Sequence, residues 1–583
     1  MNGFVAQNQN AVLFFPALLL TLWLTPWVIR LSKRIGAVDR PDGRKVHTRT
    51  VSRLGGLAMV AGVFVPLLLF RELDRPLVAF LAGALVVAAT GLLDDIYRIR
   101  PAAKFAGEIL GAAVFVFLGG ISLSDLGDFL GIGVVHTGAL APAVTVFCMV
   151  GVMNALNLSD GLDGLAGGIA AIGCVFLGTF AYMAGDWTSF PILVVLFGAI
   201  LGFLRFNSHP ANLFMGDAGS LLLGYSLGAV AVIMSRGSGA GADLSPVTVA
   251  GILALPITDT LLVMVRRLRH RRHPFRPDRT HLHHRLMDLG FSHAAAVPIL
   301  YFGTALFGFQ AWFDRAMPEG RQFLFIVLLA AMIHGAVFAA QRMDLRWDVR
   351  APGGNGSDPH SRMARILGKS VRPVEWTIGV AFLLPSLAVG AMSKAAGIAA
   401  LGLAACGALL FPWNRKGPQR AAVCYGLIFA SCLFLLSWFQ FSSGRPRWLP
   451  GYFALLSFLV LCWVLLKMRY RGHREILLFS GFETLIISIA IAIPLVLFPA
   501  LGLENGLRRT MLVVCFEALS VLLAMKVMIR RRHGRNRILA AVLLAAMAVV
   551  GLRGIIGSGT LTASETPGPA AAGVLPASTS PPR

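Results

Sequence analysis

Hydrophobic and polar positions along this chain alternate in long blocks. Apolar runs recur from one end of the sequence to the other and are separated by short polar segments. A run of about 20 apolar residues lets a helix cross the hydrocarbon core of a bilayer, where a helix satisfies its own backbone hydrogen bonds. The pattern therefore predicts an all-α polytopic membrane protein.

The apolar runs predict about eleven transmembrane helices in the first part of the chain. They lie near residues 11–29, 54–70, 77–93, 105–120, 138–156, 164–184, 190–206, 218–235, 247–265, 297–315 and 322–341. A polar segment at 343–375 predicts a cytoplasmic linker, and about seven more apolar runs follow within 376–553. Residues 554–583 have the composition of a disordered tail. We therefore expect a membrane-embedded domain at 1–342 and a separate transmembrane region, of unknown role, after the linker.

Composition and charge narrow the class of protein. With 56% hydrophobic and only 14% charged residues, the chain does not fit a soluble enzyme, a disordered scaffold or a secreted disulfide-rich module. The net charge of +24 could indicate nucleic-acid binding, but the basic residues cluster in short loops, such as 30–53, and no nucleic-acid motif accompanies them. Loops 121–137 and 185–189 have no Lys or Arg, so the basic loops are predicted to be cytoplasmic. This predicts a multi-pass membrane protein whose basic loops lie in the cytoplasm.

Five polar segments interrupt the apolar pattern. They are DRPDGRKVH (39–47), GLLDDIYRIRPAAK (91–104), NALNLSDGLDGLAGG (154–168), FNSHPANLFMGDAGS (206–220) and HPFRPDRTHLHHRL (273–286). Two predicted spans separate each consecutive pair, so all five are expected on the cytoplasmic face. This favours an active site open to the cytosol over a transporter, whose charges would lie near the midplane. A transporter stays the alternative, because Asp259, Glu483 and Glu517 are predicted intramembrane acids.

Carboxylates and amides in these segments suggest metal and phosphate chemistry. Asp94 and Asp95 are adjacent at a membrane border, which suits metal ligands, a general base or plain helix-end solvation. A second group recurs at intervals of three, close to one helical face, beside four glycines that permit close backbone approach. This group consists of Asn154, Asn157, Asp160 and Asp163, and its glycines are Gly161, Gly164, Gly167 and Gly168.

The last two segments add a further acid and a basic cluster. Asp217 directly precedes an apolar run, where it could cap the helix, hold Mg2+ against a diphosphate, or do both. The basic cluster consists of His281, His283 and His284, together with Arg276 and Arg279. Arginine neighbours and the absence of a nearby cysteine favour phosphate oxygens over zinc as the partners of these histidines.

Five sequence motifs of this chain, in the order in which they occur, resemble those of the polyprenyl-phosphate N-acetylhexosamine-1-phosphate transferase family. They are RKVHTRTVSRLGG, GLLDD, NALNLSDGLDGLAGG, FMGDAGSLLLG and DRTHLHHRL, and the resemblance covers about residues 1–341. The last string is similar to the branch that transfers N-acetylglucosamine 1-phosphate (GlcNAc-1-phosphate). Ser52, Arg98 and Glu108 depart from common family residues, which leaves the sugar open: another UDP-sugar or UDP-MurNAc-pentapeptide is the alternative substrate.

The resemblance implies a reaction and roles for the residues. A polyprenyl phosphate would attack the β-phosphorus of a UDP-sugar and release UMP, with Mg2+, or alternatively Mn2+, as cofactor. The implied metal ligands are Asp217 and Asp160. The implied catalytic residues are Asp94, Asp95, Asp160, Asp163 and His281. The implied substrate-binding residues are Lys45, His47, Lys104, Asn154, Asn157, Phe214, Arg279, His283 and His284. The expected partners are the UDP-sugar, the lipid and the bilayer, without nucleic acid, and the region after the linker could support homodimerisation or partner docking.

Overall fold

The computed structural model describes residues 13–39, 50–235, 244–271 and 280–344, together with scattered positions after 373. The chain divides into two compact units. The first contains Met1–Gly354 and Leu477–Arg508, and the second contains Asn355–Ile476 and Arg509–Arg583. Most of the predicted linker, nearly all of the later apolar runs and the whole tail lie outside the described residues, and the predicted domain boundaries stay a prediction.

The described part of the first unit is almost entirely helical. Its helices are α2 (Phe14–Ile35), α3 (Gly55–Phe70), α4 (Arg75–Tyr97), α5 (Pro101–Gly119), η1 (Gly138–Leu140), α6 (Ala141–Ser159), α7 (Leu165–Ala184), α8 (Ser189–Asn207), α9 (Gly216–Ser235), α10 (Pro246–Ile252), α11 (Ala254–Arg269), α12 (Leu282–Asp288), α13 (His293–Asp314) and α14 (Glu319–Arg342). Two short antiparallel strands, β1 (Val38–Asp39) and β2 (Val51–Ser52), are also present. Each of the eleven apolar runs predicted before the linker coincides with a helix or, at 247–265, with a helix pair.

The helix lengths confirm a polytopic membrane protein but not the predicted number of spans. Among the described residues, nine helices are long and apolar enough to cross a membrane, and the α10–α11 pair could make a tenth. The apolar helix α3 is shorter, with 16 residues. The apolar run predicted as a span at 247–265 is not one continuous helix, because α10 and α11 are bent by 85° relative to each other. The hydrophobic pattern indicates the length of an apolar segment, but it does not reveal a break in the helix that the segment forms.

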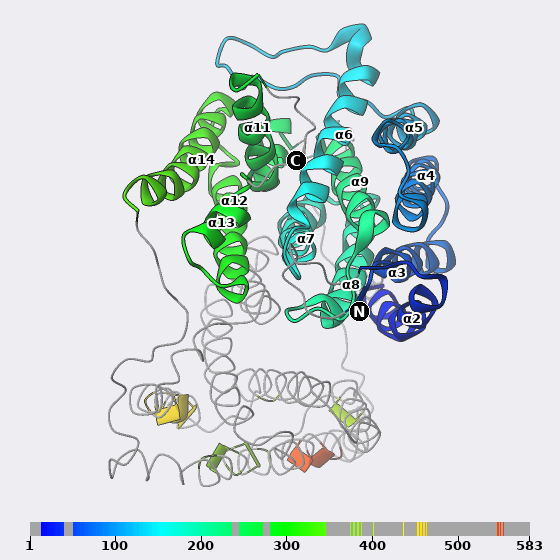
Figure 1. Cartoon of the computed structure of the whole chain (residues 1–583), viewed down its shortest axis with the longest axis vertical. Helices are drawn as coiled ribbons and strands as arrows, with labels where there is room; N and C mark the ends of the chain where they lie inside the picture. Colours follow the sequence, from blue (N-terminus) through cyan, green and yellow to red (C-terminus); the bar gives the residue numbers. More distant parts are fainter. Residues whose placement is uncertain are drawn as a thin grey trace, which may run out of the picture. The chain divides into compact units, whose positions relative to one another are not determined.

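Helix α9 lies at the centre of the described bundle (Figure 1). It packs against α3, α4, α6 and α7, so it connects the early helices with those that follow. In Figure 1 the blue helices α2–α5 lie on one side of α6, α7 and α9, and the green helices α11–α14 lie on the other. Elements far apart in the sequence therefore meet along α9.

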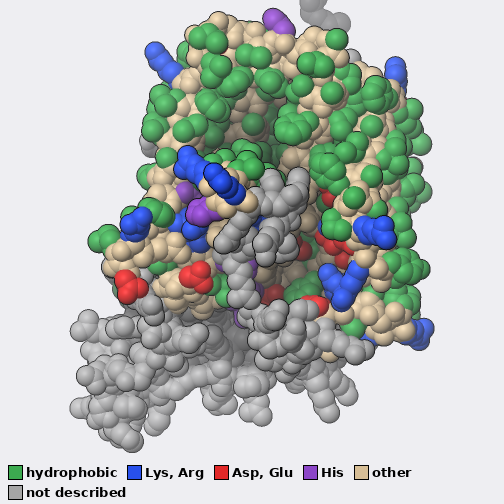
Figure 2. Space-filling view, turned by 45° about the horizontal axis from the view of Figure 1, so that its top comes forward, with side chains coloured by type: hydrophobic (Ala, Val, Ile, Leu, Met, Phe, Trp, Pro, Cys, Tyr) green, Lys and Arg blue, Asp and Glu red, His purple; other side chains and the backbone are tan. Residues whose placement is uncertain are grey.

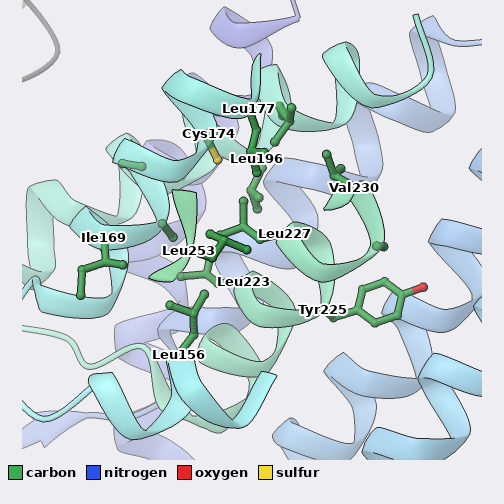
Figure 3. Close-up of a cluster of buried hydrophobic side chains, with 14 of the residues drawn as sticks. Leu156, Ile169, Cys174, Leu177, Leu196, Leu223, Tyr225, Leu227, Val230 and Leu253 are labelled. Carbon is green, nitrogen blue, oxygen red and sulfur yellow. The ribbon is translucent and has the colours of Figure 1, made fainter. Parts of the chain in front are cut away.

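The core of the bundle is formed around α7 and α9, which other helices enclose almost completely. Leu156, Leu223 and Leu253 come from α6, α9 and the break between α10 and α11 and lie close together in Figure 3, and Ile169 of α7 belongs to the same buried cluster. Tyr225 of α9 is fully buried and donates a hydrogen bond to the carbonyl of Phe80 on α4 (3.0 Å). Because a buried hydroxyl without a partner is costly, this bond helps to set the position of α4 against α9.

The outer surface is apolar where the helices would face lipid. Helices α2 and α14 leave most of their length exposed, including Trp23, Trp27 and Leu324. In Figure 2 hydrophobic side chains cover most of the upper part of the visible face, whereas the acidic side chains and most of the basic and histidine side chains lie in its lower part. Polar chemistry is thus concentrated toward one end of the bundle.

Candidate active site

Two carboxylates from different helices converge on one ammonium group at this end of the bundle. Lys104 on α5 places Nζ 2.6 Å from Oδ1 of Asp217 on α9 and 3.4 Å from Oδ2 of Asp94 on α4. Asn157 on α6 donates from Nδ2 to the same Asp217 oxygen (2.6 Å). Four helices therefore contribute to one polar centre, and Asp94, Asp217 and Lys104 each keep about a fifth of their side chain exposed. The sequence predicted the convergence of these segments, and the described contacts confirm it.

The adjacent Asp95 has a different environment from Asp94. Its carboxylate accepts hydrogen bonds from the backbone N–H groups of Asp217 (2.9 Å) and Ala218 (3.0 Å), and its side chain is buried. These N–H groups belong to the first turn of α9, where no intrahelical acceptor exists for them. Asp95 thus caps α9 from a neighbouring helix. Asp217 was one candidate for that cap, but this interpretation is wrong because α9 begins at Gly216 and Asp217 lies within its first turn.

The contact between Asp95 and the first turn of α9 depends on Gly216. Its φ is +69°, a left-handed conformation that a side chain would strain. A Cβ at this position would also collide with the Asp95 carboxylate and with the backbone carbonyl of Arg53. The glycine in the GDAGS segment therefore allows Asp95 to approach the start of α9 closely.

The expectation that four polar groups share one helical face is only half correct. Asn154 and Asn157 lie on α6, but the helix ends at Ser159, so Asp160 and Asp163 lie in the following loop. Asn154 donates to Oε2 of the buried Glu108 on α5 (2.5 Å). The spacing of three residues continues past the helix end, which the sequence pattern does not reveal.

Asp160 lies in an electronegative environment. Burial raises its pKa to about 7, and the nearby negative charges of Asp217 and Asp95 act in the same direction. Burial and the neighbouring negative charges therefore favour the protonated form of this carboxyl group. A divalent cation at the acidic centre would favour its charged form.

Asp163 belongs to a second cluster with two histidines. His209 and Asp163 form a hydrogen bond between Nδ1 and Oδ2 (2.8 Å), and the N–H of Ala211 donates to the same oxygen (3.1 Å). Burial acts to raise the pKa of Asp163, but the bond from His209 and the other partners leave it below its ordinary value. His293 completes a group whose potential ligand atoms lie within 4.8 Å of one another. The distance between His209 and Asp163 is that of a hydrogen bond, so both groups have a partner without a metal.

The histidines of the fifth polar segment lie beside the third segment. His281 and His283 are buried, and their rings are stacked with centroids 5.8 Å apart. His284 packs on His283 with a centroid distance of 4.2 Å. A Cβ at Gly161 would collide with Nε2 of His283, so this histidine lies directly against the loop that contains Asp160. Burial lowers the pKa of His283 to about 3, and the ring is therefore neutral at physiological pH.

Side-chain packing accounts for the glycines of this loop. Gly164 has a φ of +81°, and its N–H donates to Oδ1 of Asn207 (2.8 Å). Its carbonyl accepts a hydrogen bond from Tyr301 (2.6 Å), and a Cβ at Gly168 would collide with the Tyr301 ring. The sequence suggested phosphate binding as the reason for these glycines, whereas the structure uses them for a turn and for close contacts with Tyr301 and His283.

Backbone pairing joins residues 52–55, which follow the first polar segment, to the fourth segment. Phe214 donates its N–H to the carbonyl of Ser52 (2.8 Å), and its own carbonyl accepts from Gly55 (3.0 Å). The pairing places the partly exposed Phe214 next to the start of α9. Lys45, His47 and Arg279 lie outside the described residues.

The donor set of the acidic centre suits a hard divalent cation. Asp94, Asp160 and Asp217 supply carboxylate oxygens, and Asn157 and Ser220 adjoin Asp217 with an amide and a hydroxyl group. Mg2+ and Mn2+ prefer such oxygen ligands, whereas zinc sites favour nitrogen and sulfur. The residues therefore fit the cation that the resemblance implies.

Several residues around the centre were not assigned to it from the sequence. Ser220 accepts a hydrogen bond from Asn157 (2.8 Å), His209 binds Asp163, and Asp259 forms a hydrogen bond with His281. Asp259 was considered only as a possible transport residue. No periodicity links it to the histidines, because their contact depends on the return of the chain after α11.

The fold and the site define a polytopic membrane protein with an acidic centre at one end of its helix bundle. A family model described as "Glycosyl transferase family 4" matches residues 77–235. The chain is 35% identical over 308 residues to the "Probable undecaprenyl-phosphate N-acetylglucosaminyl 1-phosphate transferase" of Bacillus subtilis (strain 168), covering 52% of this chain and 83% of that protein.

Two further relatives extend this similarity. The "Decaprenyl-phosphate N-acetylglucosaminephosphotransferase" of Mycolicibacterium smegmatis is 40% identical over 338 residues, which cover 53% of this chain and 82% of the relative. The "Undecaprenyl-phosphate alpha-N-acetylglucosaminyl 1-phosphate transferase" of Escherichia coli (strain K12) is 30% identical over 313 residues, which cover 52% of this chain and 84% of the relative. The chain therefore belongs to the polyprenyl-phosphate N-acetylglucosamine-1-phosphate transferase family.

Proposed function

We propose that this protein transfers GlcNAc-1-phosphate from UDP-GlcNAc to a polyprenyl phosphate and so begins a lipid-linked polysaccharide. A phosphate oxygen of the lipid attacks the β-phosphorus of the nucleotide sugar. The bond from that phosphorus to the bridging oxygen breaks, and UMP leaves with the electron pair. The convergence of Asp94, Asp217 and Asn157 on Lys104 carries the proposal, together with the names of the relatives.

The acidic centre would hold the metal ion of the reaction. Asp217 is the principal proposed ligand, with Asp160 as a second, and a bound Mg2+ would neutralise charge on the diphosphate. Lys104, which contacts Asp217, would turn to an anionic group of the substrate. Phosphoryl transfer depends mainly on positioning and charge neutralisation. Carboxylates that hold a metal ion, together with a lysine, supply both.

The remaining residues would bind and orient the substrates. Asp94 is better placed than Asp95 to orient or deprotonate the lipid phosphate, because Asp95 is occupied by the first turn of α9. Asn154, Asn157 and Asp163 would position the nucleotide, and Phe214 would stack on uracil. His281, His283 and His284 would contact the diphosphate. Lys45, His47 and Arg279 are proposed for other anionic groups on the basis of the sequence alone.

The reaction is tested with purified full-length protein, radiolabelled UDP-GlcNAc and undecaprenyl phosphate, with Mg2+ or with EDTA. We expect UMP and labelled lipid in equal amounts, and neither of them with EDTA. UDP-GalNAc and UDP-MurNAc-pentapeptide are the comparison substrates, and a preference for either would replace the proposed sugar. Sugar flux into liposomes without UMP release would instead support a transporter.

We also propose that the active site faces the cytoplasm of the bacterial inner membrane. The basic loops support this orientation through the positive-inside rule. A cysteine introduced near Gly164, at the exposed Asn212 in the loop before α9, should be labelled only from the cytoplasmic side. A cysteine at Ile132, which is 81% exposed in the loop between α5 and α6, is the matched site for labelling from outside. Labelling of the Asn212 position from outside in intact cells would reverse the proposed orientation.

A further inference from the structure

Asp259, an acidic residue in an otherwise apolar stretch, contacts His281 of the histidine cluster. Asp259 is on α11, six residues after the break between α10 and α11, and its side chain is 13% exposed. An acid in such a position is costly unless polar groups compensate it. Oδ1 accepts the N–H of Leu282 (2.9 Å), and Oδ2 lies 3.0 Å from Nδ1 of His281. Both carboxylate oxygens are therefore used at the start of α12.

The two contacts determine which nitrogen of His281 carries the proton. An ionised carboxylate only accepts hydrogen bonds, so Nδ1 of His281 must be the donor. In the neutral ring Nε2 then has no proton and acts as an acceptor. The His281 ring is also held parallel to His283, at an interplanar angle of 10°, and His283 packs on Gly161 beside Asp160. Asp259 thus controls both the orientation and the tautomer of a ring next to the acidic centre.

We propose that Asp259 is a positioning residue of the transferase, which keeps His281 in the Nδ1–H tautomer so that Nε2 accepts a hydrogen bond from the bound substrate. The inference rests on the proposed function, because it takes the diphosphate and lipid phosphate to bind beside this ring. A protonated oxygen of the lipid phosphate, which is a monoester, or a sugar hydroxyl supplies the matching donor. Asp259 therefore acts through His281 without contacting the substrate.

Asp259→Asn tests this role with little change in shape. Leu282 requires an acceptor, so the amide oxygen takes the place of Oδ1 and the amide NH2 group faces Nδ1 of His281. The imidazole must then carry its proton on Nε2, and the acceptor is lost. We expect kcat to fall by about 10²-fold or more, the scale of a lost acid–base contact, with KM for UDP-GlcNAc within about twofold.

The matched control is Asp288→Asn, which removes a carboxylate from the exposed far end of α12. This control should keep wild-type kcat. Combining Asp259→Asn with His281→Gln measures coupling: if Asp259 acts through His281, the double variant should be no slower than His281→Gln alone. The proposal is wrong if the losses in kcat of the two single variants multiply in the double variant. It is also wrong if Asp259→Asn keeps the wild-type kcat.

A spectroscopic measurement keeps the inference separate from the activity. In 15N-histidine-labelled wild-type protein, the signals absent from His281→Gln should show a protonated Nδ1 and an unprotonated Nε2. Asp259→Asn should exchange these two signatures. An Nε2–H tautomer in the wild type would refute the inference even if the enzyme is active. The expected tautomer in a protein that makes no UMP would instead refute only the proposed function.

Discussion

At the scale of single residues, neighbours in the sequence have separate tasks. Asp94 and Asp95 are adjacent, yet one contacts Lys104 at the acidic centre and the other binds two backbone N–H groups of α9. Asp217 is where these roles meet, because its side chain binds Lys104 and its N–H group binds Asp95. Charge at Asp217 and hydrogen bonding at Asp95 can therefore be tested independently.

Asp217→Asn should abolish transfer and leave folding intact. The amide oxygen can still accept hydrogen bonds from Lys104 and Asn157, but the charge that would hold Mg2+ is lost. UMP release and the thermal midpoint in detergent measure the two effects. Asp95→Ala is the contrasting variant, which should lose about 2 kcal/mol of stability because two N–H groups lose their acceptor. Normal turnover by Asp217→Asn would remove this residue from the metal site.

His283 should make the fold sensitive to acid. Its pKa is about 3 in the folded protein, against 6.5 as the ordinary value, so between these limits the unfolded chain binds a proton that the folded chain does not. Stability must then fall as the pH is lowered below about 6, by about 1.4 kcal/mol per pH unit from this residue. Denaturation between pH 7.5 and 5 should show a shallower decline for His283→Asn than for the wild type. Equal declines would mean that His283 is protonated in the folded state.

At the scale of helices, small residues allow the close crossings on which the site depends. Gly91 of α4 faces the start of α9, where a Cβ would lie 2.5 Å from the Cα of Ala218. Gly56 of α3 is equally close to the backbone of Gly219. These contacts bring three helices together at the point where Asp95 binds the first turn of α9. The bend between α10 and α11 likewise allows Asp259 to lie close to His281.

Gly91→Ala should therefore impair both stability and activity. The added methyl group meets backbone atoms that cannot rotate away, so α4 and α9 must separate and the Asp95 contacts must lengthen. We expect a loss of about 1–3 kcal/mol, as for other overpacked interiors, and at least a tenfold slower UMP release. Gly335→Ala on α14 is the control, because no atom lies within 4 Å of its Cβ position. Equal behaviour of the two variants would contradict this view of the α4–α9 crossing.

At the scale of the whole molecule, the described part of the first unit contains the acidic centre. The relatives from Bacillus subtilis and Mycolicibacterium smegmatis cover about half of this chain, 52% and 53% respectively. The five polar segments end by Leu286, before the predicted linker. Lipid handling, partner docking, homodimerisation and regulation are the roles we propose for the later apolar runs.

A chain truncated near Pro359 should retain Mg2+-dependent transfer in membranes, with lower stability. The reason is that the groups proposed for the reaction all precede this position, and few contacts are expected to cross a polar linker. UMP release by membranes with matched amounts of inserted protein is the measurement. An inserted but inactive truncation, beside an active full-length protein, would show that both parts form one catalytic unit. That result would direct attention to Leu477–Arg508, which belongs to the first compact unit.

Properties that depend on local composition could be predicted from the sequence alone. Apolar runs long enough to span a bilayer must be helical there, so length and composition located the helices from α2 to α14, apart from the short α12 and the division between α10 and α11. The alternation of spans also predicted that the polar segments would meet. These conclusions need no knowledge of which residues touch.

Tertiary structure decided the features that depend on contacts between distant residues. Asp95 and Ala218 are 123 positions apart, and only the crossing of α4 and α9 makes one the cap of the other. The break between α10 and α11 and the end of α6 at Ser159 lie within continuous patterns, which carry no sign of them. Asp259 and His281 are paired because the bent helix returns to the site. Hydrogen bonds are directional and short-ranged, so the partner of each buried polar group follows from the packed fold and not from its place in the sequence.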